Sequence, residues 1–154
     1  NARAIGLNPA VNVPASANWV KTFERVPGAT VRGSGAPAGT EVTASVELAI
    51  PQTNGSFTYI QHAEADDEGR FSLQLPYATT GYDAYGPAEG YTNVSVRATG
   101  PYTVTAPPQF DGSGLTTYRA ELAVDEGAVN GAAPRTVTVT LSEDTSAITP
   151  ADSD

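Results

Sequence analysis

Hydrophobic and polar side chains alternate with a period of two residues over several short stretches of the chain. The clearest stretch places Val42, Ala44, Val46, Leu48 and Ile50 on one side. Glu, Thr and Ser occupy the odd-numbered positions from 41 to 47 and point to the other side. Successive side chains of a strand point to opposite faces, so this pattern predicts a half-buried strand. The alternation recurs in Phe71-Leu73-Leu75, Val94-Val96-Ala98, Tyr118-Ala120-Leu122-Val124 and Val137-Val139-Leu141, and Phe57-Tyr59 opens another strand.

Turn signals separate these stretches. Fifteen Gly and 12 Pro residues interrupt any long helical period, and Asn54-Gly55 and Asp67-Glu68-Gly69 are typical of tight turns. The chain is therefore expected to be all-β, an antiparallel Ig-like or transthyretin-like β-sandwich of about seven or eight strands. Trp19, Phe23 and Val26 have helical spacing, but Pro27-Gly28 follows, so a strand over 19–26 is favoured over a short helix.

The first residues have their own pattern. The five apolar residues Ile5, Leu7, Pro9, Val11 and Val13 stand at successive odd positions, with small or polar residues between them. This predicts a strand with one apolar face, which needs a groove to cover it. A first strand of the chain's own sandwich and a linker are the alternatives. The expected division is an N-terminal extension (1–18), a sandwich (19–142) and an acidic C-terminal tail (143–154).

Composition excludes several classes of function. The 154 residues contain no Cys, one His and one Lys, and the net charge is −9. Disulfide scaffolds, thiol chemistry and His-rich metal sites are thus excluded, and nucleic-acid binding is disfavoured. No apolar run is long enough for a membrane helix. The shortage of Lys, with many small residues and 17 Asp and Glu, favours a protein that works in molar salt, where its own charge repulsion is screened.

Candidate catalytic and metal-binding residues are weak. Asp66-Asp67-Glu68 places three oxygen donors in one turn, but lacks the spacing of a calcium loop and is better explained as a solvated hairpin tip. Asp125-Glu126 and Glu143-Asp144 are interpreted in the same way. His62 lies on a predicted strand with no nucleophile motif nearby. We therefore expect no catalytic residue, no metal, no cofactor and no enzymatic activity.

Tyrosines gather in one Gly- and Pro-rich loop. Tyr82, Tyr85 and Tyr91 are candidates for an aromatic binding loop, because Tyr rings can stack on sugars or anchor an interface. The favoured alternative is that the tyrosines, with Tyr77 and Tyr102, cover the open end of the sandwich and that their hydroxyls hold loop backbone.

Two features indicate an extracellular or cell-surface protein. The chain contains no Met, so Asn1 is expected to follow a processing event such as removal of a secretory signal. Asn54-Gly55-Ser56 and Asn93-Val94-Ser95 are sequons for N-linked glycans.

Longer segments carry a family resemblance. VPGATVRGSG (26–35) and ADDEGRFSLQLP (65–76) resemble the carboxypeptidase-regulatory or transthyretin-like sandwich. Residues 19–141 resemble the extracytoplasmic C-terminal domain of haloarchaeal oligosaccharyltransferases, which N-glycosylate surface proteins. WVKTFERVPGATV (19–31), FSLQLPYATTGYDAYGPAEGYTNVSVRATGPYTV (71–104) and the closing EGAVNG and RTVTVTL segments carry this likeness. The family's Trp-Trp-Asp signature is missing, since the single Trp, Trp19, precedes Val20. The resemblance thus implies a fold and a compartment.

The function favoured by these observations is a non-catalytic structural subunit of an extracellular haloarchaeal filament or surface assembly, a homopolymer in which residues 4–13 of one copy complete the sandwich of the next. The alternatives are an accessory C-terminal domain of a haloarchaeal oligosaccharyltransferase and a sugar-binding module that uses the tyrosine loop. The expected partners are other copies of the chain and N-linked glycans.

Overall fold

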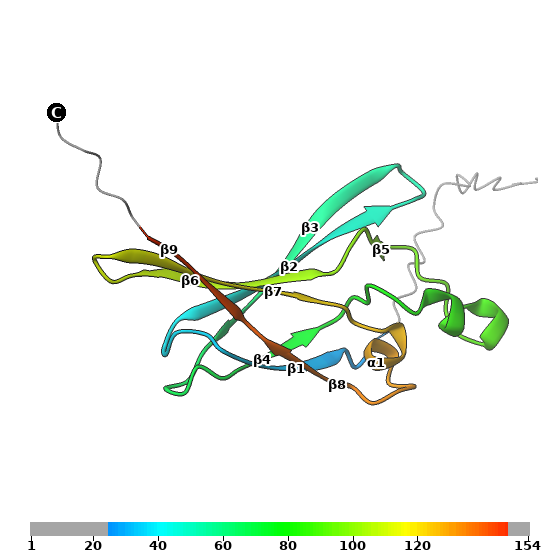
Figure 1. Ribbon diagram of the computed structural model, residues 1–154. Coiled ribbons are helices and arrows are strands. Elements are labelled where there is room, and N and C mark those ends of the chain that lie inside the picture. Colours follow the sequence, from blue (N-terminus) through cyan, green and yellow to red (C-terminus); the bar gives the residue numbers. More distant parts are fainter. Residues whose placement is uncertain (1–24, 148–154) are drawn as a thin grey trace, which may run out of the picture.

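The computed structural model describes residues 25–147, which form a two-layered β-sandwich (Figure 1). The strands are β1 (Ala29–Ser34), β2 (Glu41–Ile50), β3 (Gly55–Glu64), β4 (Phe71–Leu75), β5 (Arg97–Ala98), β6 (Tyr102–Phe110), β7 (Gly114–Leu122), β8 (Thr136–Thr140) and β9 (Ser142–Ala147). The helices are the 3₁₀ turns η2 (Tyr82–Tyr85) and η3 (Pro87–Glu89) and the short α1 (Glu126–Asn130). The expected all-β sandwich is confirmed.

The two layers differ in size. The smaller sheet has the order β4-β1-β8, and the larger has the order β3-β2-β6-β7-β9, with β5 added to β2. Every pairing is antiparallel except β1 with β8. The chain passes from the smaller sheet to the larger one at the buried Leu141, whose N–H donates to Ser34 O at 2.9 Å. β8 and β9 therefore connect the two layers.

The core lies between the sheets and follows the alternation of the sequence. Val42, Ala44, Val46 and Leu48 of β2 are at most 3% exposed, and they face Phe71, Leu73 and Leu75 of β4 among others in one cluster. Gly33 lies opposite Phe71 in the β1–β4 register, and a Cβ there would overlap the Phe71 ring. The glycine thus leaves room for the ring in the core.

Both predicted turns are confirmed. β2 and β3 are joined by residues 51–54, and Asn54 takes a left-handed conformation with φ 55°. The second turn, between β3 and β4, is held by Asp66, whose Oδ1 accepts the N–H groups of Glu68 and Arg70. These hydrogen bonds lower the pKa of the Asp66 carboxyl, and the hydrogen bond from the backbone N–H of Arg70 is the largest cause.

Three predicted boundaries need correction. The strand predicted over 94–98 shrinks to the two residues of β5, because the preceding residues belong to an irregular loop. β6 was not predicted, since Pro107 and Pro108 follow its buried Tyr102, Val104 and Ala106 and coincide with a break in register. Residues 142–147 form β9, whereas 143–154 were expected to be an acidic tail.

β9 forms although all six of its side chains are exposed. Its support is the backbone pairing with β7 and a hydrogen bond between the hydroxyls of Thr116 and Thr145 at 2.9 Å. The proposed donor strand (Ile5, Leu7, Pro9, Val11 and Val13) and residues 19–24 lie outside the described residues. Arg25 and Val26 are not in a strand.

Candidate ligand pocket

Two loops and α1 meet at one end of the sandwich. Asp125 caps α1, because its Oδ1 accepts the N–H of Gly127 at 2.8 Å. The loop that follows β4 reaches this helix start, where the N–H of Glu126 donates to Thr80 O at 2.9 Å. Gly81, with φ 84°, packs so closely on the Asp125 side chain that a Cβ would collide with it. The tyrosine loop is therefore fixed onto α1.

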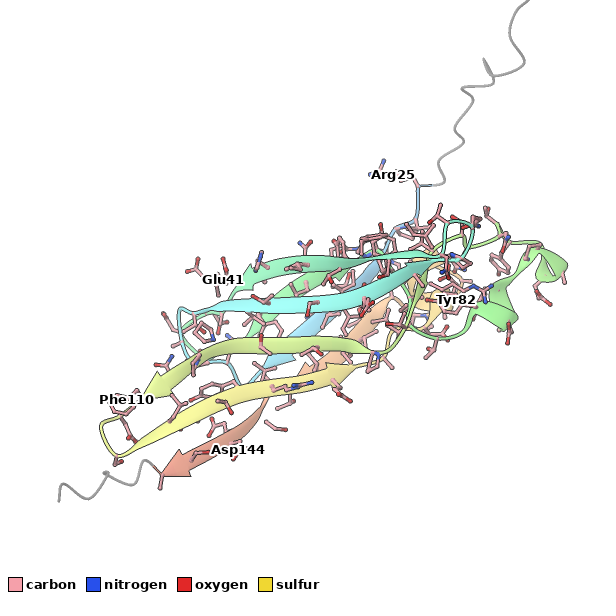
Figure 2. All side chains as sticks on the ribbon, turned by 90° about the horizontal axis from the view of Figure 1, so that it is seen from above. Arg25, Glu41, Tyr82, Phe110 and Asp144 are labelled. Carbon is pink, nitrogen blue, oxygen red and sulfur yellow. The ribbon has the colours of Figure 1, made fainter. Side chains whose placement is uncertain are left out.

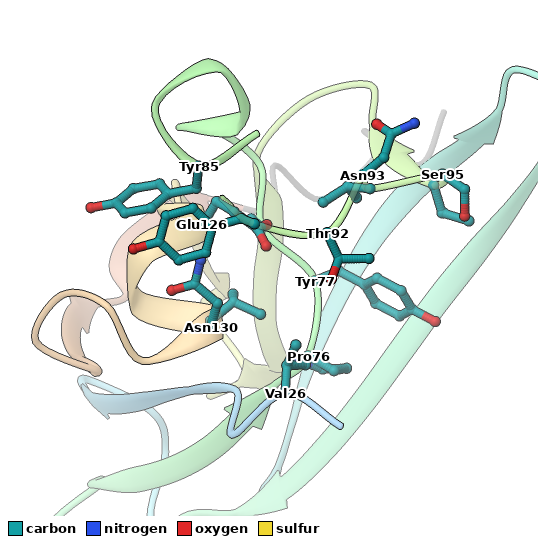
Figure 3. A pocket seen from close by; sticks show the side chains of 14 residues that line it. Val26, Pro76, Tyr77, Tyr85, Thr92, Asn93, Ser95, Glu126 and Asn130 are labelled. Atoms are coloured by element: carbon teal, nitrogen blue, oxygen red, sulfur yellow. The ribbon is translucent and has the colours of Figure 1, made fainter. Parts of the chain in front are cut away.

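A pocket of about 450 Å³ opens between the tyrosine loop, the segment that precedes β5 and α1 (Figure 3). Its walls are mainly apolar or aromatic, and its polar side chains come from Thr92, Asn93, Ser95, Glu126 and Asn130. The remaining lining residues are Val26, Pro76, Tyr77, Ala78, Tyr85, Tyr91, Val94, Val96 and Val129. An apolar enclosure with a few polar groups is the usual form of a small-molecule site.

Glu126 is the buried charged residue of this pocket. Its exposed fraction is 7%, so the expected solvated turn at Asp125-Glu126 is wrong for Glu126. The reason is that α1 begins there and turns Glu126 toward the loop that carries Tyr82. The negative charge of Glu126 contributes to the raised pKa of Tyr82, for which burial is the largest cause.

The three tyrosines of the expected binding loop have different surroundings. Tyr85 and Tyr91 line the pocket, with ring centroids 5.3 Å apart in an edge-to-face arrangement. Tyr82 does not line it. The Tyr82 hydroxyl donates to Ala78 O and accepts the N–H of Ala98, which ties the loop to β5. Of these three tyrosines, Tyr85 and Tyr91 therefore line the pocket, whereas Tyr82 has a structural role.

Tyr77 and Tyr102 support the floor of this region. The hydroxyl of the fully buried Tyr102 donates to Tyr77 O at 2.9 Å, and the Tyr77 ring packs edge-to-face on Tyr59 with centroids 5.0 Å apart. Burial raises the pKa of Tyr102. The alternative in which tyrosine hydroxyls hold loop backbone therefore describes Tyr82 and Tyr102.

Both sequons lie on the surface. Asn54 is exposed at the β2–β3 turn, and Asn93 is exposed in the loop before β5. In Figure 3 the Asn93 side chain lies at the edge of the pocket, beside Ser95. An exposed, irregular backbone is the setting in which an Asn side chain can be modified.

The other candidate residues lie elsewhere. His62 is on β3, with Nδ1 3.0 Å from Thr43 Oγ1 and 3.4 Å from Glu41 Oε1, and more than half of its side chain is exposed. Among residues 25–147, no three His, Asp or Glu side chains are arranged to hold a metal ion. His62 therefore does not line the pocket.

Sequence reasoning missed the α1 side of the pocket, namely Glu126, Val129 and Asn130. A signal was present, because Asp125 is a favoured helix-capping residue and Gly131, with φ 86°, ends the helix. A helix of five residues carries too little hydrophobic periodicity to be predicted from its pattern.

The sandwich with its irregular tyrosine loop matches a known family of peripheral domains. Residues 28–137 match the family model described as the archaeal glycosylation protein B long peripheral domain. The chain belongs to this family. The resemblance found in the sequence is thereby confirmed.

A curated relative covers nearly the whole chain. The chain is 59% identical over 138 residues to the dolichyl-monophosphooligosaccharide–protein glycotransferase AglB of Haloferax volcanii, which is 88% of this chain and 13% of that protein. The chain therefore spans about one eighth of the relative. No helix within residues 25–147 is long and apolar enough to cross a membrane.

Solved structures share the fold. Two crystal structures of the Archaeoglobus fulgidus oligosaccharyltransferase, one with Zn and sulfate and one tethered to an acceptor peptide with the NVT sequon, match at TM-scores of 0.56 and 0.55. Each match has 24% identity and covers 77% of this chain, but only 12% and 11% of the respective enzyme chain.

These comparisons overturn two expectations. The prediction of a homopolymeric filament subunit with a donor strand is wrong, because the chain belongs to the family of archaeal glycosylation protein B peripheral domains. The prediction of no enzymatic activity is wrong at the level of the family, whose relative is a glycotransferase. The apolar alternation that suggested a donor strand lies in residues that the structure does not describe.

Proposed function

We propose that this chain is the peripheral domain of an oligosaccharyltransferase, an enzyme that transfers an oligosaccharide from a dolichyl phosphate carrier to protein. The observation that carries the proposal is the 59% identity to the Haloferax volcanii glycotransferase over 88% of the chain. The family match over residues 28–137 supports it independently.

The domain lies on the extracytoplasmic side of the membrane in this proposal. The net charge of −9 and the single Lys suit a surface that meets concentrated salt. One structure of the Archaeoglobus fulgidus enzyme holds an inhibitory peptide and a dolichol-phosphate. From the name of the Haloferax volcanii relative, we propose that the intact protein containing this chain uses a dolichyl-phosphate-linked oligosaccharide and an acceptor protein as substrates.

Within that enzyme, the domain positions a neighbouring domain or the acceptor protein. The firmly paired sandwich supplies a rigid support, and its loop end presents the pocket and the Asn93 sequon on one side. Asn54 and Asn93 themselves carry N-linked glycans in this account, because both are exposed and both are followed by the required Ser.

A graft tests the proposal. The matching 138-residue segment of the Haloferax volcanii enzyme would be replaced by this chain in cells that lack their own copy, and glycosylation of a secreted glycoprotein would be measured. We expect the graft to restore glycosylation. An unrelated β-sandwich of equal length is the control, and it should not restore it.

If the graft is inserted in the membrane at normal levels and glycosylation stays absent, the chain does not serve as this enzyme's peripheral domain.

A further inference from the structure

We propose that the pocket between the tyrosine loop and α1 binds a neutral sugar residue. The pocket measures about 450 Å³, within the range of about 300–1,000 Å³ that is usual for small-molecule sites. This inference stands on the pocket and the adjacent sequon, so it does not depend on the outcome of the graft.

The aromatic wall suits the apolar face of a sugar ring. Tyr85 and Tyr91 contribute two rings held edge-to-face at 5.3 Å, and Tyr91 is 39% exposed. Tyr85 is fixed from behind, because its ring packs against the backbone of Gly127 in α1. A preformed aromatic surface costs little ordering when a ligand binds.

The polar groups of the pocket suit hydroxyl groups. The Glu126 carboxylate is an acceptor, and the Thr92 hydroxyl can donate and accept. The Asn130 amide can donate through its NH₂ group, because its Oδ1 already accepts the N–H of Ala132 at 2.9 Å. Figure 3 shows Glu126 and Asn130 coming from α1 and Thr92 from the facing loop. A ligand between these elements would meet polar groups on two sides.

The same groups argue against other ligands. The lining residues within the described range 25–147 include a carboxylate and no Lys or Arg, so a phosphate or an acidic sugar would be repelled. A lipid tail would cover the exposed Thr92, Asn93 and Ser95 with hydrocarbon, which is costly for polar groups that water would otherwise contact. A neutral sugar satisfies both the rings and the polar side chains.

Asn93 brings a source of sugar to this site. It belongs to the sequon Asn93-Val94-Ser95, and all three residues line the pocket. A glycan attached there would be held at high effective concentration beside Tyr91. The sugar can thus come from the chain's own Asn93 glycan or from a separate glycan, and the experiment distinguishes the two.

The first arm uses the 154-residue chain made in a host without N-glycosylation. Glucose, galactose, mannose, N-acetylglucosamine and their disaccharides are titrated while backbone amide NMR signals are followed. We expect saturable shifts at Tyr91, Val129 and Asn130. Tyr91→Ala should weaken the affinity about tenfold, and Tyr91→Phe should change it less than about twofold.

The matched control is Phe110→Ala. Phe110 is a 64% exposed aromatic residue at the opposite end of the sandwich from Tyr82 (Figure 2). Removing it should leave the titration unchanged, which separates loss of the site from loss of any exposed ring.

The second arm uses the chain made in Haloferax volcanii, with and without Asn93→Gln. Contacts between sugar protons and the ring protons of Tyr85 or Tyr91, lost in Asn93→Gln, assign the site to the chain's own glycan. Saturable binding in the first arm assigns it to a separate glycan. The proposal is overturned if no sugar shifts the pocket signals and the Asn93 glycan makes no contact with either ring.

Discussion

The ring of Tyr85 lies directly against the backbone of Gly127, so that a Cβ built on Gly127 would stand 2.8 Å from Tyr85 Cε2. Glycine inside a helix is unfavourable by about 0.5–1 kcal/mol relative to alanine. This contact explains why α1 nevertheless contains one. The tyrosine loop and α1 are therefore mutually fitted, and the pocket between them depends on that fit.

Gly127→Ala should displace Tyr85 from α1. Because the ring is packed and the added methyl group collides with it, we expect the free energy of unfolding to fall by about 1–3 kcal/mol. Urea denaturation in molar salt measures the change. Gly100→Ala is the control, since a Cβ at Gly100 meets no atom within 4 Å and should alter stability by less than about 0.5 kcal/mol. Equal stability of the two variants would contradict the packing described here.

The buried hydroxyl of Tyr102 predicts a loss of stability at alkaline pH. Burial raises its pKa in the folded chain above the value of about 10 expected when unfolded. Its contribution is therefore complete below pH 10 and decreases as the pH rises, by about 1.4 kcal/mol per pH unit for one such group. Denaturation between pH 9 and about 11.5 measures this slope.

Tyr102→Phe provides the comparison for the pH experiment. The variant lacks the ionising group, so its stability should fall less steeply above pH 10 than that of the parent chain. Tyr82 and Tyr59, whose pKa values are also raised by burial, account for the slope that remains. Identical slopes in the two proteins would contradict burial of the Tyr102 hydroxyl.

Strand β2 could be predicted from the sequence, whereas strand β9 could not. β2 is identified from its residues because one face is buried and the other is not, so that apolar and polar side chains alternate along the strand. β9 has no such contrast. All its side chains are exposed, and its conformation depends on pairing with β7, whose nearest paired residue, Arg119, lies 23 positions before Ser142.

The sequence indicated the tyrosines of the pocket but not the roles of the individual residues, for a related reason. The tyrosines stood out by their number, but their roles depend on which hydroxyl reaches a backbone group, as Tyr82 does with Ala98. Glu126 resembles a turn residue because Asp125 precedes it. Its burial arises from packing against the loop that contains Thr80, 46 residues earlier in the chain, and no local sequence pattern indicates that contact.

Salt should stabilise the chain. Seventeen Asp and Glu stand against eight Lys and Arg, and their repulsion is screened only when the Debye length shortens, to about 3 Å at 1 M. Dialysis from molar NaCl to about 50 mM should therefore lower the melting temperature. Sucrose, which does not screen charge, should not compensate for the missing salt to the same degree. An unchanged melting curve would remove the halophilic interpretation.

Both sequons should carry glycans when the chain is made in Haloferax volcanii. Asn54 and Asn93 are exposed, and the other five Asn residues of the sequence lack a sequon. Glycopeptide mass spectrometry is expected to find added sugar mass at these two positions and none elsewhere. Asn54→Gln and Asn93→Gln should each remove one site only. Unmodified peptides at both positions would contradict the assignment.

The central claim is that these residues form part of a much larger glycosylation enzyme. An antibody raised against the chain, used on membrane and medium fractions of the source cells, tests it most directly. The account predicts a membrane-bound polypeptide several times larger than 15.8 kDa, since the matched segment is 13% of the Haloferax volcanii glycotransferase. Detection of the antigen only as a free 15.8-kDa chain in the medium would contradict the account.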